Sequence, residues 1–426
     1  MSLFLPQLPR PRQLPRVVTS TDAKRKCLLE AEAGKNLGID IPRAYLPRLD
    51  SALEFDRERT ENYLKHTRIG DPELDRVLEE LADMQPAELH KFLKAGIELE
   101  DDVMKQAPQA FREFFDGHVG EPDWLDFEAH RPAIRAFHLN TTNVLVAFVT
   151  GVLIEGFATL ISKSFATTGR VLNANTAKRR LMQNNRHLLE TYMPGGLKRY
   201  GDGWKLSMRL RFIHARVRFL FRKEGGVWDE DFYGTPISAA HLGFAATVFS
   251  MRLLEHAKQV GAVFTRDEEA SLMELWRYAS YVMGIPESIL FRNQEEARAL
   301  WTAVLRCEPW PDADAVRMSN ALIHAIPLTA GIEDPKEKEK TLNLGYTLSR
   351  ALIGKELASQ LGFPKKNTLG ALPLWRLKVR IQRMFRSDSA TRQINFGQML
   401  EVAAYDSPKT AYLMPNHYLS TKSQPW

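Results

Sequence analysis

The spacing of apolar residues constrains this chain more than any other feature of its sequence. From Thr21 onward, apolar side chains recur at three- and four-residue intervals, and no sustained run alternates with a period of two. The first pattern is typical of amphipathic α-helices and the second of β-strands. We therefore predict an all-α fold. The expected helices span 72–83, 86–95, 102–115, 141–164, 176–192, 204–223, 236–260, 267–283, 294–306, 312–324, 337–360 and 373–385.

The chain is long enough to bury a large core. It has 426 residues, of which 44% are hydrophobic and 26% charged, the composition of an ordinary globular protein. Pro and Gly cluster only at short turns, and no internal repeat is visible. We predict four regions: a flexible arm rich in Pro and Arg (1–20), a helical lead-in (21–125), a core (126–290), and a helical cap and tail (291–426).

The stretch 143–162 is the most apolar part of the chain and has to be tested as a membrane span. Glu155 lies in its middle, and its length is marginal for crossing a bilayer. These features favour a buried central helix. Gly151 and Gly156 would let another helix or a flat cofactor approach closely.

The net charge of +6 and the pI of about 9.1 raise the question of acidic partners. The basic residues are spread along helices without a nucleic-acid-binding signature, so we predict no nucleic-acid partner. A weak association with acidic membrane surfaces stays open. The basic helix from Leu372 to Arg386 would either rest on such a surface or pack on the domain with its cations extended into water.

Two cysteines, Cys27 and Cys307, are far apart and lack the spacing of a metal site. They suggest neither a disulfide framework nor a zinc site, and a reducing cytoplasm fits them. The apolar stretch before Pro6 is too short for the core of a signal peptide. We therefore expect a cytoplasmic protein of undetermined oligomeric state.

The helix expected over 204–223 contains the most informative histidine, His214. Its apolar face is marked by Leu210, Ile213, Val217 and Leu220, and His214 belongs to that face. The arginines at 209, 211, 216, 218 and 222 are expected to point mostly outward. A buried neutral imidazole needs a partner for each nitrogen, and that partner can be a core hydrogen-bonding group or an iron ion.

Other sites of metal or nucleotide chemistry are disfavoured. The sequence has no His-Glu-x-x-His, no paired Glu-x-x-His, no Gly-x-Ser-x-Gly elbow, no P-loop and no convincing dinucleotide fingerprint. A Cys-x-x-Cys-His motif is also absent, so any haem would be held without a covalent attachment. His241 and His256 are the alternative ligands to His214.

Several segments together resemble one family. The segment RFIHARVR, Arg211 to Arg218, preceded by Arg179-Arg180-Leu181, resembles the signature of the latex-clearing protein and MpaB-type oxygenases. Further likenesses are Pro122 to Asp126, Trp228 to Ile237 with the helix that follows, and Leu275 to Tyr278 leading to Ile285. The likeness spans about 123–290 and weakens on both sides.

This resemblance implies a large, globin-like all-α domain around a b-type haem, with additional N- and C-terminal helices. It implies that His214 is the proximal ligand of the iron and that Arg180 and Arg218 contact the cofactor. The distal Lys and Thr of the family's rubber-cleaving members fall on Gln183 and Asn184. With Arg180 these two are the candidate catalytic residues: they can hydrogen-bond bound oxygen, but they lack the ammonium charge of the lysine.

Glu155 has two alternative roles. It is either a buried acid on the distal side that acts as a base, or the partner of an arginine on a neighbouring helix.

The resemblance implies an oxygenase that activates O2 at the iron and cleaves or oxidises a C=C bond of a hydrophobic, isoprenoid-like or prenylated substrate. Phe148, Leu153, Phe157 and Phe249 would suit such a substrate but are equally ordinary core residues. A peroxidase or hydroxylase on the same fold, and a non-catalytic helical protein that binds a lipid or a partner, remain alternatives.

Overall fold

The computed structural model describes residues 37–118, 121–170, 173–384, 387–404, 407 and 411–423. These residues form helices and connecting turns without any β-strand, which confirms the predicted all-α class. The chain divides into two units, 1–40 and 41–426, and the helices named below lie in the second. The predicted arm at 1–20 and Cys27 lie outside the described residues.

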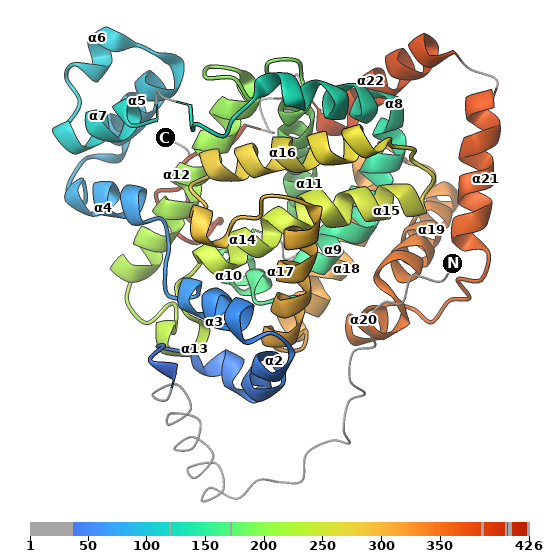
Figure 1. Ribbon diagram of the computed structural model, residues 1–426, viewed down its shortest axis with the longest axis horizontal. Coiled ribbons are helices and arrows are strands. Elements are labelled where there is room, and N and C mark those ends of the chain that lie inside the picture. Colours follow the sequence, from blue (N-terminus) through green and yellow to red (C-terminus); the bar gives the residue numbers. More distant parts are fainter. Residues whose placement is uncertain are drawn as a thin grey trace, which may run out of the picture. The chain divides into compact units, whose positions relative to one another are not determined.

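The helices follow one another closely along the chain (Figure 1). The first group is η1 Arg43–Arg48, α2 Leu49–Phe55, α3 Arg57–His66, α4 Pro72–Glu80, α5 Pro86–Glu98, α6 Asp101–Met104 and α7 Gln109–Asp116. The central group is η2 Phe127–His130, α8 Arg131–Ala147, η3 Phe148–Val152, α9 Leu153–Phe157, α10 Ile161–Thr168, α11 Ala174–Thr191, α12 Asp202–Lys223, α13 Glu230–Tyr233, α14 Ala239–Thr247, η4 Val248–Arg252, α15 Leu253–Gln259 and α16 Arg266–Val282. The last group is η5 Glu287–Ile289, α17 Gln294–Cys307, α18 Ala313–Thr329, α19 Pro335–Ile353, α20 Lys355–Gln360, α21 Ala371–Met384 and α22 Asp388–Ala403.

Local sequence explains where many of these helices begin and end. Side chains of Asp, Asn, Ser and Thr accept a hydrogen bond from the first turn at the N-caps of α3, α4, α11, α14, α16, α17, α18, α19 and α22. Three predicted helices are interrupted. The helix predicted over 141–164 breaks at residues 158–160, between α9 and α10. Pro108 separates α6 from α7, and Gly354, at φ +88°, separates α19 from α20.

The most apolar stretch forms the centre of the fold, as expected of a buried helix. Helical structure runs without a break over Phe127–Phe157, the one segment of the described chain long and apolar enough to cross a membrane. Inside the protein, 72% of its most apolar window is buried. Its neighbours include α15, α16, α19 and α22, so its apolar surface is used by packing.

Helix α12 lies in the interior of the unit, where other helices pack on it. Figure 1 shows α16 crossing α12, and α12 also contacts α4, α5 and α11. Two π-helical turns, η3 and η4, interrupt the paired helices α8–α9 and α14–α15 and contact each other, with the rings of Phe148 and Phe249 5.4 Å apart. Such π-helical turns are rare and occur frequently at functional sites.

The arginines near His214 do not mostly point outward as predicted. Arg211 and Arg218 are buried on the side of α12 that α4 covers, and Arg216 is buried on another side, next to Pro415. Arg211 binds Asp71 through Nε–Oδ2 and Nη2–Oδ1 contacts of 2.5 and 2.9 Å.

Arg218 makes a second ion pair on the same side of α12. Its Nη2 lies 2.7 Å from Oδ1 of Asp75, and its Nε donates to the same carboxylate. The ion pairs of Arg211 and Arg218 therefore fix α12 against α4.

We expect the buried ion pair Arg211–Asp71 to contribute most of the stability of the contact between α12 and α4. The substitution Asp71→Asn removes the charge but keeps an N-cap oxygen for α4, and it should lower the free energy of unfolding by about 3 kcal/mol, because Arg211 is left with less countercharge in the interior. Glu79→Gln is the matched control, since the pair of Glu79 with Arg222 is largely exposed and should contribute less than about 1 kcal/mol. Urea unfolding measures both, and equal losses would contradict the assignment.

Candidate functional site

An interior cavity of about 190 Å³ lies among the helices of the central group. Its walls come from η3, α9, α10, α11, α12, α14, η4 and α16, and most of the lining side chains are apolar. The polar groups that reach it are few and include His214, Arg180 and Asn184. An apolar cavity with a few converging polar groups is the usual form of a ligand or cofactor site.

His214 faces this cavity from α12. Its Nδ1 is buried without a hydrogen-bond partner, and no hydrogen bond joins its Nε2 to another described residue. Burial, together with the charges of Arg218 and Arg180, lowers the pKa of His214 to about 3. The imidazole is therefore neutral near pH 7 and has the lone pair that a metal ligand needs.

Arg180 also lines the cavity, but no carboxylate of the described chain pairs with it. Its Nη1 donates to Oε1 of Gln183 at 3.1 Å, its guanidinium lies 5.3 Å from the ring centre of Phe165, and its Nε has no partner. Burial lowers the pKa of Arg180. An unpaired guanidinium in such surroundings favours an anionic ligand.

Arg170 is a second cation of the cavity wall, and sequence reasoning missed it. Its Nη1 donates to the backbone oxygen of Tyr418 at 3.3 Å, and no carboxylate of the described chain pairs with it. Burial and the charges of Arg180 and Arg179 lower its pKa to about 10. Arg170 follows α10 and lies outside the segments that carry the family resemblance, so only the fold brings it beside Arg180.

Gln183 and Asn184 differ in what they reach. Asn184 lines the cavity, and its amide makes no hydrogen bond to a described residue. Gln183 is buried outside the cavity, where it accepts from Arg180 and donates to the backbone oxygen of Ala411 at 3.1 Å. Asn184 is therefore available to a bound molecule, while Gln183 positions Arg180.

Glu155 is the partner of an arginine on a neighbouring helix, which is the second of its two predicted roles. It does not line the cavity; its Oε1 and Oε2 accept from Arg252 at 2.5 and 2.9 Å, and its Oε1 lies 3.1 Å from Nε2 of His256. Burial opposes ionisation, but the attraction of Arg252 and His256 outweighs it and lowers the pKa of Glu155 to about 2. This carboxylate is held ionised in an ion pair, which makes it a poor base.

Arg218 lies away from the cavity as well. Besides its pair with Asp75, its Nη1 donates to the backbone oxygen of Ile237 at 3.0 Å. These partners satisfy its charge within the protein. Its effect on the site is indirect, because its charge helps to keep His214 neutral.

The two alternative ligands occupy different surroundings. His256 is buried beside Glu155, outside the cavity. His241 lines the cavity, but its Nε2 lies 3.0 Å from the hydroxyl of Tyr45 and 3.5 Å from Oε1 of Glu308. Since these partners hold its Nε2, His241 is less free than His214.

Among the described residues, five buried polar atoms of the cavity walls lack a hydrogen-bond partner. They are Nδ1 of His214, Nδ1 of His241, Nε of Arg180, Oγ of Ser164 and Oγ of Ser280. Buried polar atoms of native proteins are nearly always satisfied, so this concentration indicates that the cavity binds a group with polar or ionic atoms.

The two glycines of the apolar stretch have different neighbours. A Cβ on Gly151 would lie 2.6 Å from the ring of His256, so Gly151 admits another helix. Gly156 lines the cavity, and a Cβ there would meet nothing within 4 Å. Only the second glycine therefore borders the candidate site.

Of the four apolar residues expected to suit a hydrophobic substrate, some line the cavity and one does not. Leu153, Phe157 and Phe249 line the cavity. Phe148 does not line it and belongs to the core, where its ring packs on that of Phe249. Three of the four side chains are thus placed where they can contact a bound molecule.

The C-terminal segment Ala411–Ser423 contacts Arg170 and Gln183 beside the cavity, although none of its own residues lines the cavity. Besides accepting from Gln183 and Arg170, it places the backbone N–H of Ser420 2.8 Å from the backbone oxygen of Thr168. Its Tyr412 is buried.

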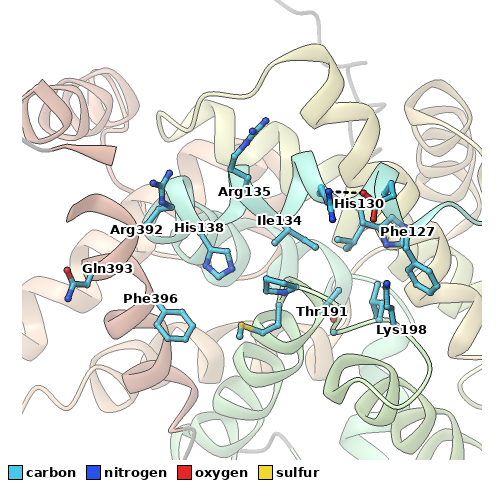
Figure 2. A pocket seen from close by; sticks show the side chains of 18 residues that line it. Phe127, His130, Ile134, Arg135, His138, Thr191, Lys198, Arg392, Gln393 and Phe396 are labelled. Carbon is cyan, nitrogen blue, oxygen red and sulfur yellow. Dashed lines mark ion pairs between the residues drawn. The ribbon is translucent and has the colours of Figure 1, made fainter. Parts of the chain in front are cut away.

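A hollow of about 710 Å³ lies elsewhere, at the surface between α8, α22 and the turn after α11. Figure 2 shows Phe127 and Lys198 at one end of it and Arg392, Gln393 and Phe396 at the other. Its cations are exposed to solvent. We place the candidate site in the interior cavity, because five unsatisfied buried polar atoms, including Nδ1 of His214, converge on it.

No group of three or more His, Cys, Asp or Glu side chains within the described chain is arranged to hold a metal ion. A metal at His214 would therefore need further ligands from a cofactor. A porphyrin supplies four of them, and two propionates match the two unpaired arginines. The residues of the site thus have the chemistry that haem b needs. A cavity of about 190 Å³ is below the usual size of ligand pockets, so it has to widen to admit this cofactor.

Comparison with known proteins agrees with the fold. The family model described as ER-bound oxygenase mpaB/B'/rubber oxygenase, catalytic domain, matches residues 135–384, more than half of the chain. A solved structure of latex clearing protein LCP in the closed state is similar, with a TM-score of 0.61 and 17% identity over 80% of this chain and 90% of that chain. The search of curated proteins found no match.

The contrast between the two glycines is testable. Gly151→Ala should lower the free energy of unfolding by about 1–3 kcal/mol, because the new methyl group overlaps the ring of His256. Gly156→Ala should leave it unchanged or raise it by up to about 1 kcal/mol, because alanine favours the helix and the site is open. Thermal or urea unfolding compares them, and a loss for Gly156→Ala as large as that for Gly151→Ala would contradict the packing described.

Proposed function

The chain belongs to the mpaB and rubber oxygenase catalytic-domain family, and from this premise we propose that it is a haem-b-dependent oxygenase with His214 as the protein ligand to iron. The observation that supports this most directly is His214 itself, a neutral imidazole whose buried Nδ1 has no hydrogen-bond partner, in an apolar interior cavity. Arg170 and Arg180 are the residues that would hold the two propionates.

When bound, haem b supplies the activation of O2, and the protein sets ligation, polarity and access. The apolar walls, including Leu153, Phe157 and Phe249, keep water from the site. Asn184 offers an amide at the position of the Thr of rubber-cleaving members, so it can donate a hydrogen bond to a bound molecule. The Lys of those members falls on Gln183, which is uncharged and does not line the cavity.

Proton transfer in this site would have to use groups other than a carboxylate. No Asp or Glu of the described chain lines the cavity, and Glu155 is held in its ion pair with Arg252. His187 and His241 are the imidazoles of the wall besides His214; Nε2 of His187 lies 2.9 Å from Oγ of Ser207. Burial lowers the pKa of His187 to about 4, so it is neutral near pH 7.

The proposed substrate is a hydrophobic molecule with a C=C bond, of the isoprenoid or prenylated class. Two observations support it: the apolar lining of the cavity, and the family description, which names a rubber oxygenase and thus an enzyme acting on a polyisoprenoid. Oxygenative cleavage would add both atoms of O2 across the double bond, so that one alkene gives two carbonyl groups. We further propose that the protein acts in the cytoplasm.

The decisive measurement is the visible spectrum of the haem-supplemented protein with and without dithionite and carbon monoxide. We expect a Soret band in the wild type, and its loss or strong shift in His214→Ala, because the imidazole is the protein ligand. His138→Ala is the control, since His138 lies at the surface hollow outside the cavity. A colourless wild type, or an unchanged spectrum in His214→Ala, would overturn the haem assignment.

Activity is tested separately by incubating the haem-loaded protein with squalene and O2 and analysing carbonyl products. Aldehydes or ketones that appear with the wild type and not with His214→Ala would support cleavage. A haem spectrum without such products would leave the ligand assignment intact and contradict the proposed reaction on this substrate class.

We expect the two arginines to bind the propionates. Arg170→Gln and Arg180→Gln should each weaken haem binding by roughly tenfold or more, the loss expected for a charge-assisted hydrogen bond. Arg179→Gln, on the exposed side of α11, should leave the affinity unchanged. Titration with haem dimethyl ester provides a second control, because without propionate charges the wild type and the variants should bind alike; equal losses with the ester would contradict propionate binding.

A further inference from the structure

Helix α21 leaves one complete apolar face uncovered. Leu374, Leu377, Ile381 and Met384 are 67%, 52%, 47% and 75% exposed, and Leu369, just before the helix, is 90% exposed. The intervals of three, four and three residues place the four helical side chains on one side of α21. We call these four residues the apolar stripe.

The opposite side of α21 is already used for packing. Leu372, Trp375 and Val379 are partly buried, and α21 contacts α19 (Figure 1). The stem of Arg376 lies against Gly261, where an added Cβ would be 3.3 Å from its Cγ. The helix is therefore held on the unit by one face, while the apolar stripe stays in water.

The charge around the stripe has one sign. Residues 357–387 contain seven Lys and Arg and no Asp or Glu. At 100° per residue, Lys378 flanks the stripe on one side and Arg380 on the other, with Arg376 beyond Arg380. These three side chains are exposed and make no ion pair within the described chain.

A second copy of the helix fits this surface poorly. The stripe has the three-four spacing of a coiled-coil seam, but its flanking positions carry Lys378 and Arg380, and residues 357–387 of a second copy contain no Asp or Glu to pair with them. An acidic lipid surface accepts both features, because its acyl region takes the apolar side chains and its headgroups attract the cations.

We propose that α21 is an interfacial helix that docks this protein on bilayers containing anionic lipids, with the apolar stripe inserted and Arg376, Lys378 and Arg380 at the headgroups. This surface is separate from the residues that line the interior cavity. The proposed docking of α21 on a bilayer does not depend on haem binding at His214.

Sedimentation with vesicles tests this on the full-length protein. We expect binding to vesicles of phosphatidylcholine with about a third phosphatidylserine, and binding weaker by roughly tenfold or more to phosphatidylcholine alone or at high salt, because the cations contribute through the surface potential. Leu377→Ser with Ile381→Ser, and separately Lys378→Glu with Arg380→Glu, should each reduce the partition coefficient at least by that factor.

Matched controls carry the same chemical changes elsewhere. Phe55→Ser alters an exposed apolar residue of α2, and Lys91→Glu with Lys94→Glu reverses two exposed charges of α5; neither should reduce binding. All altered side chains are exposed, so the melting temperatures should stay close to that of the wild type. A melting temperature that falls in the stripe variant would show that the stripe is packed, and would overturn the proposal.

Three further results would overturn it. The first is no binding of the wild type to anionic vesicles, and the second is equal binding by the wild type and both α21 variants. The third is a dimer in sedimentation velocity that becomes a monomer in Leu377→Ser with Ile381→Ser while no vesicle binding is seen, which would assign the stripe to a second copy of the chain.

Discussion

The burial of two arginines on α12 is the constraint on which the position of His214 depends. Arg211, His214 and Arg218 are three and four residues apart, so the imidazole lies at the border between the charged side of α12 and its apolar side. A buried guanidinium without a carboxylate is costly, so Asp71 and Asp75 fix the rotation of α12 about its axis. With that rotation fixed, His214 faces the cavity.

The distribution of countercharges separates structural arginines from those of the site. Arg211, Arg218 and Arg252 each have a carboxylate partner, and each lies away from the cavity. Arg170 and Arg180 line the cavity and have none within the described chain. A negatively charged group bound in the cavity would supply the countercharge that these two arginines lack within the described chain.

The sequence could predict the all-α class, most of the central helices and the placing of His214 and Arg180, since these follow from periodicity and from local motifs. It could not predict partners that are distant along the chain. The role of Glu155 depended on Arg252, 97 residues away, and Arg170 gained its role only through its position beside Arg180. The neighbours Gln183 and Asn184 differ because successive residues of a helix point about 100° apart, so only one of them reaches the cavity.

The walls of the cavity are held by interactions of unequal strength. On one side, breaking the buried ion pairs of α12 costs about 3–5 kcal/mol each. The segment Ala411–Ser423 contacts the wall residues Arg170 and Thr168 through hydrogen bonds to backbone groups, each of which contributes about 1 kcal/mol, and its own Tyr412 and Met414 are buried. The position of α12, and with it of His214, is therefore fixed chiefly by charged contacts with α4, whereas the wall near Arg170 depends on backbone hydrogen bonds and buried side chains.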